Sequence, residues 1–366
     1  MLNIMIMIIV TKNTLSLSFI LFIVLKIKRG NMLKKLGISI LILSSSLFAT
    51  QEVNIYSHRH YDTDKELFKM FEKETGIKVN VVKAEAKALI KRIQTEGEKS
   101  PADVLITVDA AGLYKAKSSG LLQTIKSDIL EKNIPVKLRD KDNQWFGLTK
   151  RARIAVYKVG SGIKNQLSTY EELADPKFKG EIMVRSSNNT YNQSLLAAVI
   201  AHHGEEFALK WAKGIVANMA KEPKGNDRYQ VKAVANGIGS IAIANTYYIG
   251  KMVDNKDKSQ AQAVKKVKIF FPKFENGGTH INVSGAGVTK YAPNKDNAIK
   301  FIEFLASADA QRIFAEGNFE YPILKDVKAS ELVQSWGTFT DDTISINTLG
   351  ENNAKAVRIF DQAGWK

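Results

Sequence analysis

The stretch VNIYSHRHYDTDKELFKMFEKETGIKVNVV, residues 53–82, decides the fold. Its first four residues form a short β-type run, and a helix follows from near Asp64, with apolar side chains at helical spacing up to Gly76. Residues 77–82 then alternate between apolar and polar side chains, which predicts a second strand. A helical pattern over 88–96 and a buried strand over 103–108 continue the series. This β-α-β-α-β order is typical of a parallel sheet covered by helices, and the fold class is therefore α/β.

The rest of the chain predicts a second α/β lobe and two crossings between the lobes. We expect the first crossing at 145–157 and a return strand at 280–288, followed by a helix that Asn294 caps. Between the crossings the pattern predicts a strand over 182–184, helices over 193–202 and 207–216, and a buried strand over 238–244. Two lobes joined by crossing hinge strands enclose a cleft that can close on a ligand. We expect an N-terminal lobe over 50–150, a C-terminal lobe over 151–280, a return to the N-terminal lobe over 281–325, and C-terminal helices over 326–366 that pack on the C-terminal lobe.

The first 49 residues contain six basic and no acidic side chains, and they include a candidate export signal. Residues 32–49 begin Met-Leu-Lys-Lys, continue as an apolar run and end in a small residue, which is the layout of a secretory signal peptide. We expect Met32 to be the true start and residues 1–31 to be an extension from a start codon placed too early. The apolar stretch 15–25 is too short to span a bilayer, and a membrane anchor fits poorly because basic residues at 26–29 separate two short runs.

Composition narrows the class of partner and of chemistry. Without the first 49 residues the formal charge falls from +16 to +10, because six of the 53 basic and none of the 37 acidic residues lie there. The remaining lysines alternate with acidic residues, as at 64–66 and 71–74, which is typical of a solvated helix face and not of a phosphate-tracking stripe. We therefore predict no nucleic-acid partner. The chain has no cysteine, which excludes disulfides, thiolate zinc sites, iron–sulfur clusters and cysteine nucleophiles.

Five side chains are candidate metal ligands: His60, Tyr61, Tyr191, Tyr247 and Tyr248. A phenolate is a hard anionic oxygen ligand, and phenolates with one imidazole suit a small trivalent cation better than a soft metal. The alternative remains open at this point, because tyrosines at strand ends are most often packing residues with one satisfied hydroxyl. His58 and His60 also form a His-x-His pair, which would suggest zinc or copper, although we expect His58 to face solvent.

Five motifs follow one another along the chain: YSHRHYD (56–62), SPADV (100–104), WFGLTKRAR (145–153), ANTYY (244–248) and QAG (362–364). In this order they resemble the periplasmic ferric-ion-binding proteins of ABC importers, which are bacterial analogues of transferrin. The resemblance runs over nearly the whole of the chain after the signal. It implies the type II periplasmic-binding-protein fold and ferric iron as the ligand. Members of the family bind iron with paired tyrosines that correspond to Tyr247 and Tyr248, and with a histidine that corresponds to His60.

The chain departs from many members of that family in two ligands. The position of a glutamate ligand reads Val108, with Asp109 beside it, and the turn that holds an anion reads Asn-Asn-Thr-Tyr at 188–191. The chain is similar instead to the subgroup in which tyrosines equivalent to Tyr61 and Tyr191 supply oxygens directly and no synergistic anion is needed.

Charge and proton balance add two expectations. Four phenolates overcompensate one trivalent ion, so we expect nearby cations to balance the site, and the candidates are Arg59, Arg151 and Arg153. A phenol has an ordinary pKa of about 10, and only a strong Lewis acid displaces its proton near neutral pH. Metal binding is then coupled to proton release, and we expect acidification to release the metal.

The resemblance implies a monomeric periplasmic binding protein that captures Fe³⁺ and delivers it to an inner-membrane ABC permease and its ATPase. The alternative within the same fold is a periplasmic carrier of an oxyanion, a polyamine or another small organic ligand, in which the tyrosines would line an aromatic or hydrogen-bonding pocket. An enzyme is disfavoured, because the sequence offers no nucleophile with a base, no paired carboxylates in a matching context and no cofactor loop.

Overall fold

The computed structural model describes residues 5–9, 20–24, 51–253 and 255–366. The chain forms two units, Met1–Ala49 and Thr50–Lys366. In the first unit β1 (Met5–Ile9) pairs antiparallel with β2 (Ile20–Val24). The expected extension over 1–31 is described only at these two strands, and the expected signal peptide over 32–49 lies outside the described residues. Among the described residues, no helix combines the length and the apolar character that crossing a membrane requires.

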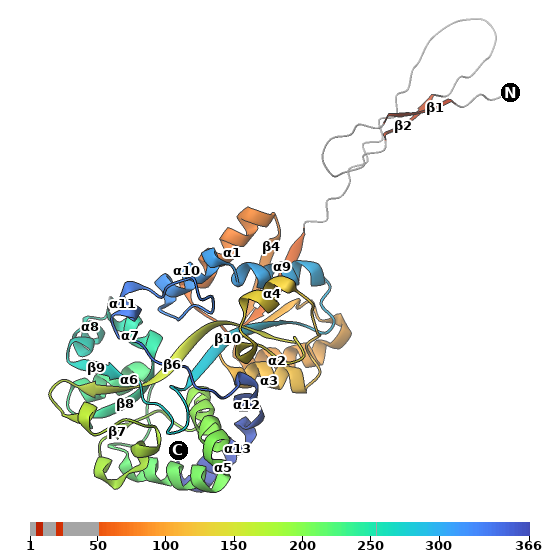
Figure 1. Cartoon of the computed structure of the whole chain (residues 1–366). Helices are drawn as coiled ribbons and strands as arrows, with labels where there is room; N and C mark the ends of the chain where they lie inside the picture. The colour runs from red at the N-terminus through yellow and green to blue at the C-terminus, as the bar shows by residue number, and fades with distance from the viewer. Residues whose placement is uncertain (1–4, 10–19, 25–50, 254) are drawn as a thin grey trace, which may run out of the picture. The chain divides into compact units, whose positions relative to one another are not determined.

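The second unit is built on an eight-stranded sheet in the order β4-β3-β5-β10-β6-β8-β7, with β9 also paired with β6 (Figure 1). Its strands are β3 (Glu52–Ser57), β4 (Lys78–Lys83), β5 (Val104–Thr107), β6 (Phe146–Lys158), β7 (Ile182–Met183), β8 (Ile241–Asn245), β9 (Val267–Phe270) and β10 (Ile281–Val288). Its α-helices are α1 (Asp62–Thr75), α2 (Ala86–Glu96), α3 (Ala110–Ser118), α4 (Asp128–Asn133), α5 (Thr190–Asn218), α6 (Asp227–Ala235), α7 (Thr246–Val253), α8 (Lys258–Lys265), α9 (Lys295–Leu305), α10 (Ala308–Asn318), α11 (Glu331–Gln334), α12 (Ile346–Glu351) and α13 (Asn353–Ala363).

The first half of the sheet has the predicted β-α-β-α-β order. β3 lies parallel to both β4 and β5, with α1 and α2 as the connections. Leu67 and Phe71 of α1 are fully buried, and the Phe71 ring meets the Phe301 ring of α9 edge to face, with centroids 5.1 Å apart. The helix ends at Gly76, whose φ of 71° is a left-handed conformation that glycine adopts readily. The apolar spacing in the sequence thus predicts the face that α1 buries.

Two long strands join the halves of the sheet, and they run side by side through the middle of Figure 1. β6 continues for 13 residues, pairs with β10 along its first part and pairs with β8 along 153–157. β10 pairs with β5 on its other edge, so both crossing strands belong to one continuous sheet. A register shift between Ser284 and Gly285 marks a bulge in β10. A Cβ at Gly285 would lie 2.5 Å from the carbonyl oxygen of Phe146, so the close approach of β6 requires glycine there. The predicted two α/β lobes with crossing strands are confirmed.

The second half of the sheet differs from the prediction in its helices. β7 and β8 are parallel, as in other α/β units. The two helices predicted over 193–202 and 207–216 are present on either side of a kink at Gly204, whose φ of 82° is not helical, and together they make up α5. Sequence patterning missed α6 and α7 altogether. Because α7 starts at Thr246, directly after β8, the Tyr-Tyr pair lies in a first helical turn and not at a strand end.

The remaining helices return to the first half and then close over both halves. Asn294 precedes α9 as predicted, but its side chain does not cap the helix, because its amide donates to a carboxylate oxygen of Asp103 at 3.0 Å. α10 packs against three helices, α1, α7 and α9. The last helix, α13, packs against α5, and α12 contacts both α3 and α5.

Candidate metal centre

The candidate ligands come from the N-terminal ends of three helices. Tyr61 immediately precedes α1, Tyr191 lies in the first turn of α5, and Tyr247 and Tyr248 lie in the first turn of α7. The N-terminal end of a helix carries partial positive charge and unpaired amide groups, so it stabilises an anionic side chain beside it. The fold therefore places the backbone of all four tyrosines at helix N-terminal ends.

The four tyrosine rings form one cluster. The hydroxyl of Tyr247 donates to that of Tyr191 at 3.0 Å. The ring of Tyr61 approaches the ring of Tyr247 edge to face, with centroids 6.1 Å apart, and the rings of Tyr247 and Tyr248 are 4.3 Å apart. The imidazole of His60 lies 4.9 Å from the ring of Tyr61. All five predicted side chains are thus brought together, although more than 180 residues separate Tyr61 from Tyr247.

The cluster is buried on one side and open on the other. Tyr247 is 1% exposed and Tyr61 is 8% exposed, whereas His60 is exposed. An open pocket of about 510 Å³ begins at this surface. It is lined by His60, Tyr61, Asp62, Thr63, Arg228, Tyr247, Tyr248, Gly250, Lys251, Asn255, Gly317 and Phe319. A small solute can therefore reach the cluster from solvent.

The electrostatics of the cluster set a condition on what can bind. Burial raises the pKa of Tyr61 to about 12, and the negative charge of Glu320 adds to the shift. Burial also raises the pKa of Tyr191 and of Tyr247 well above the usual value, and the neighbouring phenols add to it because two phenolates repel each other. These hydroxyls are protonated at neutral pH unless a strong Lewis acid displaces their protons. Among the described residues no group of three or more His, Cys, Asp or Glu side chains could hold a metal ion, so a metal in this pocket would need the phenolates.

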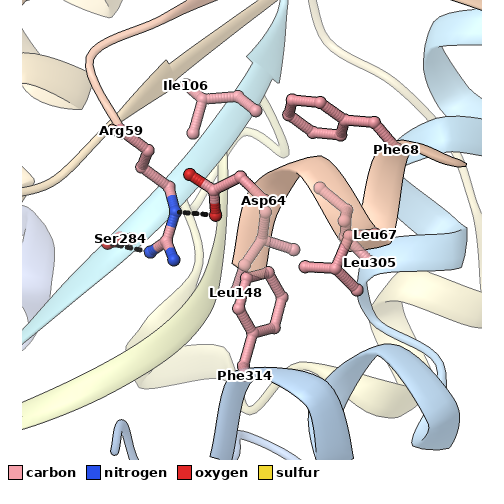
Figure 2. Close-up of a pocket in the computed structure, with 9 residues that line it drawn as sticks. All are labelled: Arg59, Asp64, Leu67, Phe68, Ile106, Leu148, Ser284, Leu305 and Phe314. Atoms are coloured by element: carbon pink, nitrogen blue, oxygen red, sulfur yellow. Dashed lines mark hydrogen bonds and ion pairs between the residues drawn. The ribbon is translucent and has the colours of Figure 1, made fainter. Parts of the chain in front are cut away.

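Two of the predicted arginines are fixed behind the rings by one carboxylate. Arg59 and Arg151 both bind Glu320, with N–O distances of 3.2 and 2.8 Å, and all three side chains are buried. Figure 2 shows Arg59 also donating to Asp64 at 3.0 Å and to Ser284 at 2.8 Å. Burial alone would raise the pKa of Glu320, but the two guanidinium groups outweigh it and lower the pKa to about 2.

These two arginines also face the rings of two candidate ligands. The guanidinium carbon of Arg59 is 4.8 Å from the centroid of the Tyr61 ring, and that of Arg151 is 5.8 Å from the centroid of the Tyr247 ring. A cation at this distance favours the phenolate form of each ring. Arg59 and Arg151 together with Asp64 and Glu320 carry no net formal charge, so the predicted charge-balancing role of these two arginines stays a prediction.

The third predicted arginine belongs to a different group. Arg153 donates to Asp227 at 2.9 Å and to Asn192 at 2.6 Å, and Arg185 binds the same carboxylate at 3.2 Å. Both guanidinium carbons lie about 6 Å from the centroid of the Tyr191 ring, at 6.0 and 5.8 Å. Because two cations share the single carboxylate of Asp227, one positive charge beside Tyr191 has no carboxylate of its own.

Sequence reasoning missed two cations in the pocket, Lys251 and Arg228. The ammonium of Lys251 lies 3.6 Å from the centroid of the Tyr61 ring, and the Arg228 guanidinium lies 5.6 Å from that of Tyr248. Burial lowers the pKa of Lys251 to about 8, which the carboxylate of Glu320 partly offsets. Lys251 follows Tyr247 by four residues, a spacing that places both on one face of a helix. The signal was present, but it required α7 to be predicted first.

Two other residues lie elsewhere. His58 does not face solvent as predicted, because its side chain is only 13% exposed and its Nε2 pairs with Glu85 at 2.9 Å. Asp109 caps α3 by accepting from the amide of Gly112 at 2.8 Å, and it is not among the residues that line the pocket.

A two-lobed fold with a pocket between its halves, lined by candidate metal-binding side chains, is the architecture of a solute-binding protein. The chain belongs to the family described as bacterial extracellular solute-binding protein, whose model matches residues 99–339. It is 51% identical to iron uptake protein A1 of Synechocystis sp. over 86% of this chain and 88% of that protein. It is 28% identical to the major ferric iron-binding protein of Neisseria meningitidis over 88% of this chain and 96% of that protein.

Solved structures agree with this assignment. The Trichodesmium protein IdiA (FutA), solved in complex with iron and citrate ligands, superposes with a TM-score of 0.83 at 47% identity, covering 86% of this chain and 100% of that one. The ferric binding protein from Campylobacter jejuni gives a TM-score of 0.82 at 45% identity, with the same coverage. The predicted type II periplasmic-binding fold and the predicted resemblance to ferric-binding proteins are confirmed.

Proposed function

We propose that this protein captures ferric iron in the cleft between its lobes and carries it to an ABC importer. The observation that carries this function is the Tyr191–Tyr247 hydroxyl pair at 3.0 Å, with Tyr61 and Tyr248 beside it. Relatives over most of the chain are iron-uptake and ferric-binding proteins. They bind and transport, and we assign no catalytic step to this chain.

The proposed ligands are the imidazole of His60 and the phenolates of Tyr61, Tyr191, Tyr247 and Tyr248. Four phenolates and Fe³⁺ leave one negative charge. The arginine pair that shares Asp227 supplies a positive charge without its own carboxylate, next to Tyr191. Lys251, beside Tyr61, supplies another when protonated. The arginine pair alone offsets the single negative charge, and together with the resemblance to the subgroup that needs no synergistic anion this supports a site made of protein side chains alone.

The transport role adds three proposals. The lobes span 50–150 with 281–325, and 151–280 with 326–366, and they close about β6 and β10. The family description, an extracellular solute-binding protein, supports a place outside the cytoplasm, and we assign the protein to the periplasm. There it would act as a monomer that delivers iron to an inner-membrane permease and its ATPase.

The test is a titration of the iron-free protein, residues 50–366, with ferric citrate in buffer without phosphate or carbonate. We expect a purple-to-red charge-transfer band that saturates at one iron per chain. Tyr247→Phe and Tyr248→Phe each remove one phenolate, and we expect each to shift the band and to weaken binding at least tenfold. Tyr291→Phe is the control, because Tyr291 is an exposed tyrosine that does not line the pocket. A colourless wild-type protein, or a Tyr247→Phe protein with an unchanged band, would refute the proposal.

A further inference from the structure

Phe319 lies beside the tyrosine cluster in a backbone conformation that bulky residues rarely adopt. It follows the last residue of α10, with φ 55° and ψ 33°, which is the left-handed region. Among the described non-glycine residues Asn143 is the other one with positive φ, and asparagine tolerates that conformation far better than phenylalanine. The surrounding structure must therefore hold Phe319 in place.

The residues on both sides of Phe319 are fixed. Asn318 and Glu320 are fully buried, and the amide of Asn318 donates to the carboxylate of Glu320. The backbone of Tyr321 exchanges two hydrogen bonds with that of Lys150 in β6, at 2.9 and 3.0 Å. The direction of the Phe319 ring is thus set by the crossing strand and by the buried arginine–glutamate group.

The ring of Phe319 packs directly against the backbone of Gly250 in α7, where glycine has no side chain. A Cβ at Gly250 would lie 2.6 Å from the Cβ of Phe319 and 2.7 Å from its Cδ2, well inside van der Waals contact. The Cβ of Phe319 cannot swing away, because its backbone is held. Any side chain at Gly250 would therefore separate α7 from the end of α10.

This contact joins the same helices that bring the tyrosines together. α10 packs on α1, which Tyr61 precedes, and α7 carries Tyr247 and Tyr248 and packs on β6 and β8. Phe319 and Gly250 line the pocket together with the tyrosines. We propose that Phe319 is a positioning residue, whose ring seats against Gly250 when the lobes close and so sets the distance between Tyr61 and the Tyr247–Tyr248 pair. The inference rests on the ferric-iron function proposed above.

The test uses Gly250→Ala, Phe319→Gly and the double variant, because glycine removes the Cβ at 319 and tolerates its positive φ. The proposal confines the Phe319–Gly250 contact to the closed form, and alanine is the better helix former, so Gly250→Ala should prevent closure while leaving the open, iron-free protein at least as stable as the wild type. We expect iron retention against citrate, followed by the charge-transfer band, to fall at least tenfold in Gly250→Ala. We expect a smaller loss in Phe319→Gly, and recovery of the double variant to within threefold of Phe319→Gly, because glycine removes both the ring and the Cβ that a side chain at Gly250 would meet.

Gly214→Ala is the matched control, because its Cβ would lie 2.7 Å from the Cβ of Ala174, at the opposite end of α5 from Tyr191. This control should lower the melting temperature of the iron-free protein and leave iron retention unchanged. The proposal is overturned if the double variant retains iron no better than Gly250→Ala. It is also overturned if Gly250→Ala binds iron as the wild type does, or if it destabilises the iron-free protein as the control does. A wild-type protein without the iron band would instead refute the function itself.

Discussion

Replacing Glu320 by glutamine removes the carboxylate that binds both Arg59 and Arg151 while keeping the shape of the side chain. All three side chains are buried, so the two guanidinium groups would lose their shared counter-charge in a region that water does not reach. Removing one partner of a buried ion pair typically costs about 3–5 kcal/mol. The pKa of Glu320 gives a second measure, because a decrease from 4.5 to about 2 corresponds to about 3 kcal/mol of folding free energy.

The pH dependence of this effect has a definite sign. Glu320 has a lower pKa in the folded state than in the unfolded chain, so its contribution is complete above pH about 4.5 and is lost as the pH falls toward 2. Urea unfolding of the iron-free proteins at pH 7 should therefore give a Glu320→Gln midpoint about 1 M lower, for an m value of about 3 kcal/mol/M. Near pH 3 the difference from the wild type should be about half as large.

Glu316→Gln is the matched control, because Glu316 lies on the same helix, α10, and is exposed. Its stability should match that of the wild type within about 0.5 kcal/mol. The reasoning is refuted if Glu320→Gln is as stable as the wild type at pH 7, or if its deficit is the same at pH 3 as at pH 7.

Two further predictions concern the metal and the crossing strands. Burial raises the pKa of Tyr61 to about 12 and the pKa values of Tyr191 and Tyr247 well above their usual value, so these phenols are protonated before iron binds. Iron binding at pH 7 should therefore release about four protons per ferric ion, counted by pH-stat against a protein-free blank. Release of one proton or none would contradict phenolate binding. The buried Tyr170 hydroxyl donates to the Arg153 carbonyl at 2.5 Å and accepts from the His280 amide at 3.1 Å. Tyr170→Phe should therefore lower the free energy of unfolding by about 2 kcal/mol, measured by urea unfolding, and leave the iron band unchanged. A decrease in the free energy of unfolding of less than about 0.5 kcal/mol would contradict this prediction.

The parts of the fold that the sequence predicts are those in which local pattern and burial agree. The apolar runs at β3 and β5 and the helical face of α1 are buried as their spacing indicates. α7 could not be found in this way, because its residues include Tyr-Tyr-Ile-Gly, which have weak helix propensity. Its position after β8 and its packing against Phe319 are tertiary effects, and a window of sequence does not contain them.

The candidate site divides in the same manner. The five candidate ligands follow from their residue types and from the order of the motifs, and the structure places them together. Glu320 and Asp227 could not be identified as partners of the arginines, because nothing local separates a buried carboxylate from the many exposed ones. Their roles depend on contacts with Arg59, Arg151 and Arg153 that span 74 to 261 positions in the sequence.

The unbroken run of β6 through both halves of the sheet has a consequence for dissecting the protein. A fragment that stops before residue 153 would lack β10 and so expose the edges of β5 and β6 that β10 covers, and a fragment that starts there would leave β10 without either of these neighbours. Unpaired strand edges of this kind invite aggregation. Neither half should therefore be obtainable as a soluble piece by truncation, and only a circular permutation that keeps this strand intact would preserve a folded product.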